Sequence, residues 1–141
     1  MDNPGALQFT QNGGAFQIGA PATATSDPTS GCDLAGITAL TLQFAFKFGS
    51  GSGTVTAYVQ TSLDQGQSWI DIAAVQFTNA SSTQIVNLSG LVPQTTPLTP
   101  TQGTLAAGTC VDGVLGDRVQ AVVVTTGAYQ NSLLNLTGVA R

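Results

Sequence analysis

The sequence predicts an all-β chain, folded as an antiparallel, jelly-roll-like β-sandwich. Three observations predict this fold. Charged residues make up only 7% of the chain, so the usual surface helix formers are scarce, whereas Thr, Val and Gly abound. Segments that alternate apolar and polar residues recur along the chain. Gly, Pro, Asn and Ser separate these segments at the spacing of sandwiches and jelly rolls. The length of 141 residues fits one domain.

The clearest predicted strand covers 37–48, ITALTLQFAFKF. Its large apolar residues share one parity and alternate with Thr, Gln, Ala and Lys, which indicates one buried face. The glycine-rich run GSGSG at 49–53 is predicted to turn the chain. The remaining predicted strands are, in order, 15–19, 54–61, 68–78, 83–88, 118–126 and 133–139, of which 15–19 and 83–88 are short.

Two segments offer a sandwich little to bury. Residues 19–33 are rich in Pro, Thr and Ser, and residues 92–108 carry three of the six prolines. Loops of this length without structure of their own are uncommon unless they have a function. The sequence is equally consistent with two flexible linkers and with two functional loops or extended arms.

The N-terminal residues 1–14 are predicted to form an extended arm, followed by a single β-sandwich domain over 15–141 that carries the long Pro/Thr loop. We expect neighbouring protein chains to order both the arm and the loop, because neither can bury much by itself. The side chains expected to contact a capsid or another subunit are Leu7 and Phe9 in the arm and Leu98 and Leu105 in the loop.

The charge content excludes several classes of partner. Lys47, Arg118 and Arg141 are the only cations, and the net charge is −4. A nucleic-acid footprint needs many more Lys and Arg residues, so no nucleic-acid partner is expected. No basic amphipathic helix and no apolar run of about 20 residues is visible, so no membrane partner is expected either. The first residues also lack the basic start and apolar core of a signal peptide.

The chain lacks the residues of the common catalytic and metal sites, so no enzyme activity, cofactor or metal is expected. It has no His, which excludes Ser-His-Asp and Cys-His catalysis. Cys32 and Cys110 match no zinc spacing and are expected to be buried or half-buried thiols. Asp64 and Asp71 could be imagined as a glycosidase pair, but the alternation around Asp71 predicts a solvated strand residue.

Residues 62–69, SLDQGQSW, match the pattern S-x-D-x-G-x-S/T-W and resemble the Asp-box of sialidases and other β-propeller proteins. The pattern has the chemistry of a turn: Asp64 can accept backbone hydrogen bonds, and Gly66 can adopt a positive φ. We therefore predict a structural turn formed by Ser62, Asp64, Gly66 and Trp69. The sialidase resemblance would imply an arginine triad, a tyrosine nucleophile and several blades, whereas this chain has two arginines and one box.

The run TAYVQTSLDQGQSWIDIAAVQFT and the later GDRVQAVVVTTGAY resemble small virion proteins encoded beside the capsid genes of tailed bacteriophages. The resemblance covers about residues 54–141 and is strongest to capsid decoration, or cement, proteins, several of which are small β-sandwiches or jelly rolls. It implies a structural virion protein that binds the outer surface of the phage capsid shell and stabilises it. The implied partners are the major capsid protein and copies of the chain itself, as a dimer or trimer.

The same resemblance implies a place on the capsid surface of the virion, after assembly in the host bacterial cytoplasm. Two alternatives remain open at this point. The chain could be a phage tail, adaptor or fibre structural protein with the same fold. It could also be a carbohydrate-binding module, for which Trp69, Tyr58 and Tyr129 are the candidate stacking rings among its Trp and Tyr residues.

Overall fold

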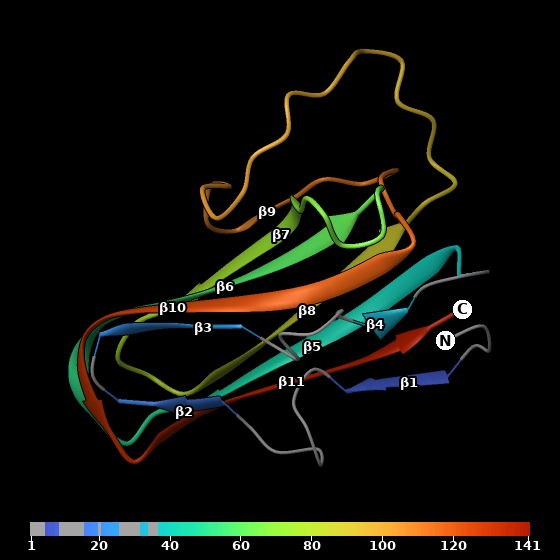
Figure 1. Ribbon diagram of the computed structural model, residues 1–141. Coiled ribbons are helices and arrows are strands. Elements are labelled where there is room, and N and C mark those ends of the chain that lie inside the picture. The colour runs from blue at the N-terminus through green and yellow to red at the C-terminus, as the bar shows by residue number, and fades with distance from the viewer. Residues whose placement is uncertain (1–4, 9–15, 20, 26–31, 34–36) are drawn as a thin grey trace.

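A computed structural model describes residues 5–8, 16–19, 21–25, 32–33 and 37–141 of the chain. All regular elements among these residues are β-strands, and all pair in antiparallel fashion. They form two sheets that face each other (Figure 1). The predicted all-β, antiparallel sandwich is therefore confirmed. Phe9 lies outside the described residues.

The first sheet has five strands in the order β1-β11-β5-β8, with β2 also paired to β11. The second sheet has six strands in the order β3-β10-β6-β7-β9, with β4 also paired to β10. The bounds of the strands are β1 Gly5–Gln8, β2 Phe16–Ile18, β3 Ala22–Thr25, β4 Cys32–Asp33, β5 Ala39–Lys47, β6 Ser50–Ser62, β7 Ile70–Phe77, β8 Ser82–Ser89, β9 Thr109–Cys110, β10 Arg118–Gln130 and β11 Ser132–Ala140.

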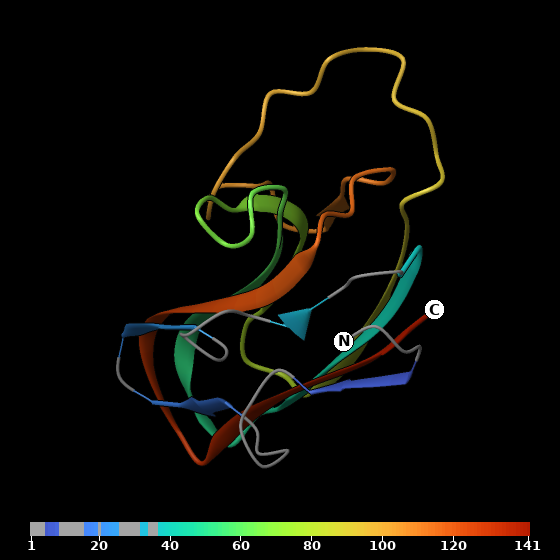
Figure 2. The ribbon, with the colours of Figure 1, turned by 45° about the vertical axis from the view of Figure 1, so that its right-hand side comes forward.

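A single folded ribbon connects the two sheets. The strands β5 and β6 pair with β11 and β10 in one continuous register, from Leu40 opposite Ala140 to Ser62 opposite Arg118. The residue numbers of every pair in this ladder add up to the same total, so no residue is inserted at the bend. The ribbon folds over at Gly49 and Asn131, on the left-hand side of Figures 1 and 2, and passes there from one sheet to the other.

The run 49–53 does not form the predicted turn, because residues 50–53 belong to β6 and pair with 127–130 of β10. Gly51 and Gly53 have φ values of 119° and 129°, a conformation that only glycine adopts readily. Gly127 lies directly opposite Gly53, and a Cβ on Gly53 would overlap the backbone of Thr126. The glycines therefore keep the two strands paired through the bend, and β10 continues past its predicted end at residue 126.

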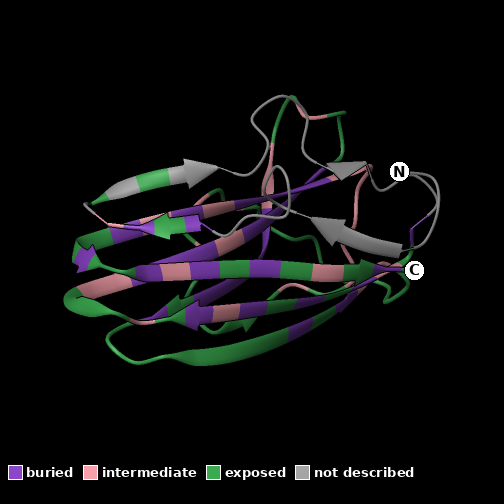
Figure 3. Cartoon of the chain, turned by 90° about the horizontal axis from the view of Figure 1, so that it is seen from below, coloured by how far each residue is buried: buried purple, intermediate pink, exposed green. Residues whose placement is uncertain are grey.

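The core lies between the facing sides of the two sheets. Leu40, Leu42 and Phe44 of β5 are fully buried and belong to one cluster with Val55 and Val59 of β6. Figure 3 shows the resulting alternation of buried and exposed bands along the strands. Burying each Leu or Phe side chain contributes about 1.5–3 kcal/mol. The predicted period-two pattern over 37–48 is thus confirmed.

The sequence did not predict several short strands at the edges of the sheets. They are β1, β3, β4 and β9; the predicted strand at 15–19 is present as β2. The segment Gly5–Gln8, inside the predicted arm, pairs with 137–140 of β11. A neighbouring chain is therefore not needed to supply backbone hydrogen bonds to this segment. The contacts expected of the arm with other chains stay a prediction.

Candidate functional site: a projecting arch and its anchors

The segment 91–108, here called the arch, leaves the end of β8 and loops away from both sheets before it returns to β7, as Figures 1 and 2 show. Its residues from 91 to 100 are all exposed, and the three prolines among them restrict the backbone. Leu98 is 43% exposed on this stretch, and Leu105 is half-buried further along. The structure thus places Leu98 on the projecting stretch, whereas Leu105 lies against the body of the protein, where its backbone N–H bonds to Asp71.

The carboxylate of Asp71 holds one end of the arch. Its Oδ1 accepts hydrogen bonds from the Gly103 backbone N–H (2.9 Å) and from Gln60 Nε2 (2.8 Å). Its Oδ2 accepts hydrogen bonds from Thr101 Oγ1 (2.9 Å) and from the backbone N–H groups of Thr104 (3.0 Å) and Leu105 (3.1 Å). The Asp71 backbone N–H also donates to the Thr101 carbonyl, at 2.8 Å. This one side chain therefore fixes residues 101–105 against β7.

The prediction that Asp71 is a solvated strand residue is wrong, because its side chain is only 1% exposed. A register shift beside Val59 and Gln60 sets Asp71 opposite Gln60, and the arch then covers it. Burial alone would raise the pKa of Asp71, but hydrogen bonds led by those from Gly103 and Gln60 outweigh it and lower the pKa below 3.8. The alternation within β7 could not show this, since the covering segment comes about thirty residues later.

A row of buried polar side chains extends the Asp71 anchor across the second sheet. Gln120 Nε2 of β10 donates to Gln60 Oε1 of β6 at 2.8 Å, and Gln60 in turn donates to Asp71 of β7. Gln60 and Gln120 are 2% and 8% exposed. Sequence reasoning missed this row. The sequence signal for this row is that Gln60 and Gln120 each alternate with the buried apolar residues of their strands.

Asp112 holds the other end of the arch. Its Oδ1 accepts a hydrogen bond from the Ser89 backbone N–H at 2.7 Å, and its carbonyl accepts one from the side chain of Gln94. The Gly113 backbone N–H donates to the Ser89 carbonyl at 2.8 Å, and Gly113 has a φ of 86°. Residues 112–113 therefore tie the end of β8 to the start of the arch through hydrogen bonds.

An apolar patch lies beside this end of the arch. Leu63, Leu91 and Val92 are 64%, 74% and 42% exposed. Together with the partly buried Val114 and Leu115 they border a hollow of about 400 Å³. Neighbouring exposed apolar side chains of this kind mark surfaces that bind other proteins. The apolar patch and the arch together form the candidate binding surface.

The Asp-box segment forms a hydrogen-bonded turn between β6 and β7. The two carboxylate oxygens of Asp64 accept hydrogen bonds from Ser62 Oγ (2.9 Å), the Ser68 backbone N–H (2.8 Å) and Ser68 Oγ (2.6 Å), while the Gly66 backbone N–H donates to Ser62 Oγ (2.7 Å). Gly66 has a φ of 92°, and a Cβ there would lie 3.7 Å from the Trp69 ring.

Gly116 supports the base of this turn and was not predicted. Its backbone N–H donates to Thr61 Oγ1 at 2.8 Å, and a Cβ on Gly116 would overlap the Ser62 carbonyl. Leu63 of the same turn belongs to the apolar patch. The turn therefore serves as a support for the candidate binding surface.

The variant Gly66→Val should melt at a lower temperature than Asp64→Ala. Valine at a φ near 92° carries backbone strain of about 1–3 kcal/mol, whereas Asp64 is exposed and water can replace its hydrogen bonds. Thermal denaturation of both variants and of the unaltered protein shows which variant has the lower melting temperature. Equal and negligible decreases in melting temperature would show that the turn does not depend on Gly66.

Stability should decrease in acid because of Asp64 and Asp71. Hydrogen bonds from Ser68 lower the pKa of Asp64, and the pKa of Asp71 is also lowered. When folding lowers the pKa of a carboxyl group, the ionised group stabilises the folded protein at any pH above its pKa in the unfolded chain. This stabilisation is lost as the pH falls through the pKa of the group in the folded protein. The melting temperature should stay level down to about pH 5 and fall below about pH 4. A smaller fall in Asp71→Asn would identify Asp71 as a contributor; an identical profile would contradict this.

The other candidate groups do not come together. Asp64 lies in the turn and Asp71 under the arch, with separate hydrogen-bond partners. Tyr129 is 4% exposed and donates to the Thr78 carbonyl at 2.8 Å, so its ring cannot form a stacking platform with Trp69 and Tyr58. Cys110 is a free, exposed thiol on β9, which corrects the expectation of a buried or half-buried one.

In the described ranges, no three His, Cys, Asp or Glu side chains gather as a metal site would require. The same ranges contain no helix with the length and hydropathy of a membrane span. No protein-family model matches the chain, and a search of curated proteins found no match to its sequence.

Proposed function

We propose that this chain is a structural virion protein that binds the outer surface of a phage capsid shell and stabilises it, as decoration or cement proteins do. The observation that carries the proposal is the arch: an exposed segment with apolar side chains, fixed at both ends before any partner binds. The proposed partners are the major capsid protein and further copies of the chain. The folded ribbon of β5–β6 and β10–β11 supports a jelly-roll-like classification as part of this proposal.

Anchoring at both ends matters because ordering a free loop upon binding costs about 1–2 kcal/mol per residue. Asp71 and Asp112 order residues next to the exposed stretch within the free protein. Less conformational entropy is then lost when a partner covers Leu98 and Leu91. A loop with this arrangement suits permanent contact with a large surface.

The scarcity of charge supports the same conclusion. With a net charge of −4 and only three cations, the surface of the protein is mostly Thr, Ser, Gln, Asn and Gly. Charged residues are depleted at the centres of protein interfaces, because they are costly to remove from water. The arch carries no charged residue between 91 and 108, so contact with a shell would not trap an unpaired charge there.

The variant Leu98→Asp should bind shells that lack this protein at least about tenfold more weakly than the unaltered chain. Its melting temperature should not change, because Leu98 is 43% exposed. Val139→Asp is the matched control, since Val139 is 40% exposed but lies on the outer face of the first sheet. Co-sedimentation with shells of the major capsid protein measures both. Unchanged binding of Leu98→Asp would contradict a role of the arch in binding.

A further inference from the structure

The strand β8 is the one long edge strand among the described elements. The other edge strands, β1, β2, β3, β4 and β9, have four residues or fewer, whereas β8 has eight. It contains no charged residue and no proline, and its register with β5 has no shift. Proteins usually protect long edges by charge, proline or a bulge, because an open edge pairs with other strands. None of these protects β8.

The hydrogen bonds at the end of β8 show which of its groups face the open edge. The Gly90 backbone N–H donates to the Thr38 carbonyl at 2.7 Å. Hydrogen-bonding direction alternates along a strand, so even-numbered residues of β8 bond to β5 and odd-numbered ones point away. Ser89 agrees with this phase, because its outward N–H and carbonyl bond to Asp112 and Gly113. The backbone groups of 83, 85 and 87 remain on the open edge.

We propose that β8 pairs with β8 of a second copy of this chain, antiparallel and around a twofold axis at Ile85. The open run 83–87 is symmetric about Ile85, so Thr83 of each copy would lie opposite Asn87 of the other. Opposite residues of an antiparallel pair lie on the same face of the sheet. In this register the two Ile85 side chains would therefore be neighbours on one face. The inference rests on the edge strand and does not depend on capsid binding.

The side chains on this edge suit a second copy. No residue of β8 is charged, so the two strands would meet without like-charge repulsion. Ile85 is 66% exposed and would gain an apolar neighbour in its own counterpart. Such a contact uses the same surface on both copies, as twofold dimers do. It would join the two first sheets into one continuous sheet.

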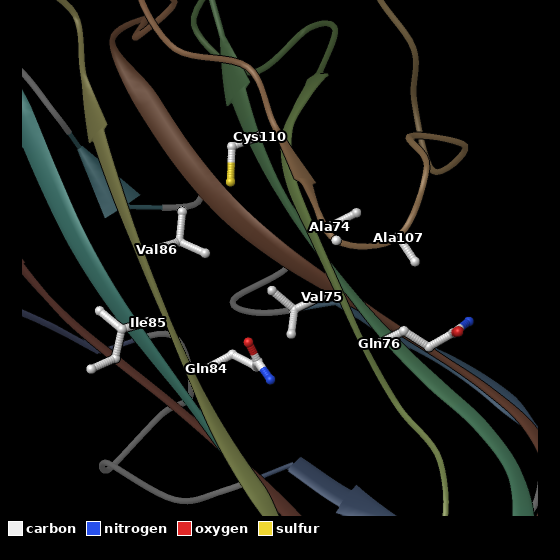
Figure 4. Close-up of a pocket in the computed structure, with 9 residues that line it drawn as sticks. Ala74, Val75, Gln76, Gln84, Ile85, Val86, Ala107 and Cys110 are labelled. Atoms are coloured by element: carbon white, nitrogen blue, oxygen red, sulfur yellow. The ribbon is translucent and has the colours of Figure 1, made fainter.

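The open edge also borders a cleft between the two sheets. Figure 4 shows Gln84 and Val86 of β8 on one side of it, and Ala74, Val75 and Gln76 of β7 on the other. The cleft has a volume of about 400 Å³. Here the sandwich is open, since β8 ends the first sheet and only the short β9 extends the second. A second β8 would lie along this open side.

The test measures self-association of the full-length chain by sedimentation equilibrium. The unaltered chain should dimerise, and Ile85→Lys should raise the dimer dissociation constant by about tenfold or more, because like charges would lie opposite each other. Val139→Lys is the matched control: it places the same charge on the same face of the sheet, away from the edge. It should leave the dimer intact.

A mixture of Ile85→Lys with Ile85→Asp tests the register. Opposite charges at the facing positions should restore a mixed dimer, while each variant alone stays mostly monomeric. A monomeric unaltered chain, or equal dissociation by Val139→Lys, would overturn pairing through the edge. Failure of the mixture to form dimers would overturn the register at Ile85. Binding of β8 to a strand of another protein, with no self-association, would also refute the proposal.

Discussion

The variant Gly53→Ala is expected to lower the free energy of unfolding by about 3–5 kcal/mol. Gly53 has a φ of 129°, and an added Cβ would overlap the carbonyl of Thr126 on the opposite strand. The contact is between two backbones, so no side-chain rotation can relieve it. Both the strain and the overlap fall at the bend of the ribbon that joins the two sheets. A domain of ordinary stability, about 5–15 kcal/mol, would lose much of it.

Urea denaturation of Gly53→Ala beside Gly19→Ala measures this effect. Gly19 is the matched control because no atom of the described residues, its chain neighbours aside, lies within 4 Å of an added Cβ there, and its φ is not positive. The control should be within about 1 kcal/mol of the unaltered chain. Similar stability of the two variants would show that the ribbon does not bend through Gly53 as described.

The second large effect is expected for Asp71→Ala, which should cost about 3 kcal/mol and release one end of the arch. The substitution leaves the Gln60 amide, which is 2% exposed, without its carboxylate partner. An unsatisfied buried donor costs about 1–3 kcal/mol, and the hydrogen bonds from residues 101–105 are lost as well. Residues 101–105 should therefore lose protection from amide hydrogen exchange, while β5 and β6 keep theirs.

Asp64→Ala is the control for Asp71→Ala, because it removes a carboxylate that is also hydrogen-bonded, but exposed, from the same hairpin. It should destabilise the protein less and leave exchange in 101–105 unchanged. If Asp71→Ala also leaves exchange there unchanged, Asp71 does not anchor the arch. Binding to capsid shells should also weaken in Asp71→Ala, because residues 101–105 would then be ordered only when the partner binds.

The sequence predicts the strands that carry their own signal and misses those that depend on distant partners. The run 37–48 alternates strongly, and its buried face follows directly from that alternation. Short edge strands such as β4 and β9 have two residues each and exist only because β10 and β7 pair with them. The run GSGSG is predicted as a turn because glycine is common in turns; only the opposite strand shows that it lies within a bend.

The candidate site shows the same division. The turn residues Asp64 and Gly66 follow from a local pattern, since their partners lie within a few positions. The burial of Asp71 depends on residues about thirty positions later, which alternation cannot reveal. The prolines of 92–108 predict a long loop. Its two anchors, Asp71 and Asp112, can be identified only from their hydrogen bonds in the folded structure.

Counting the copies of this chain in purified phage particles tests the proposed function most directly. Quantitative mass spectrometry against the major capsid protein gives the ratio. A decoration protein repeats with the shell lattice, so on the order of hundreds of copies per particle are predicted. About six or twelve copies would instead place the chain in a tail or adaptor and contradict the proposal, as would its absence from the particle.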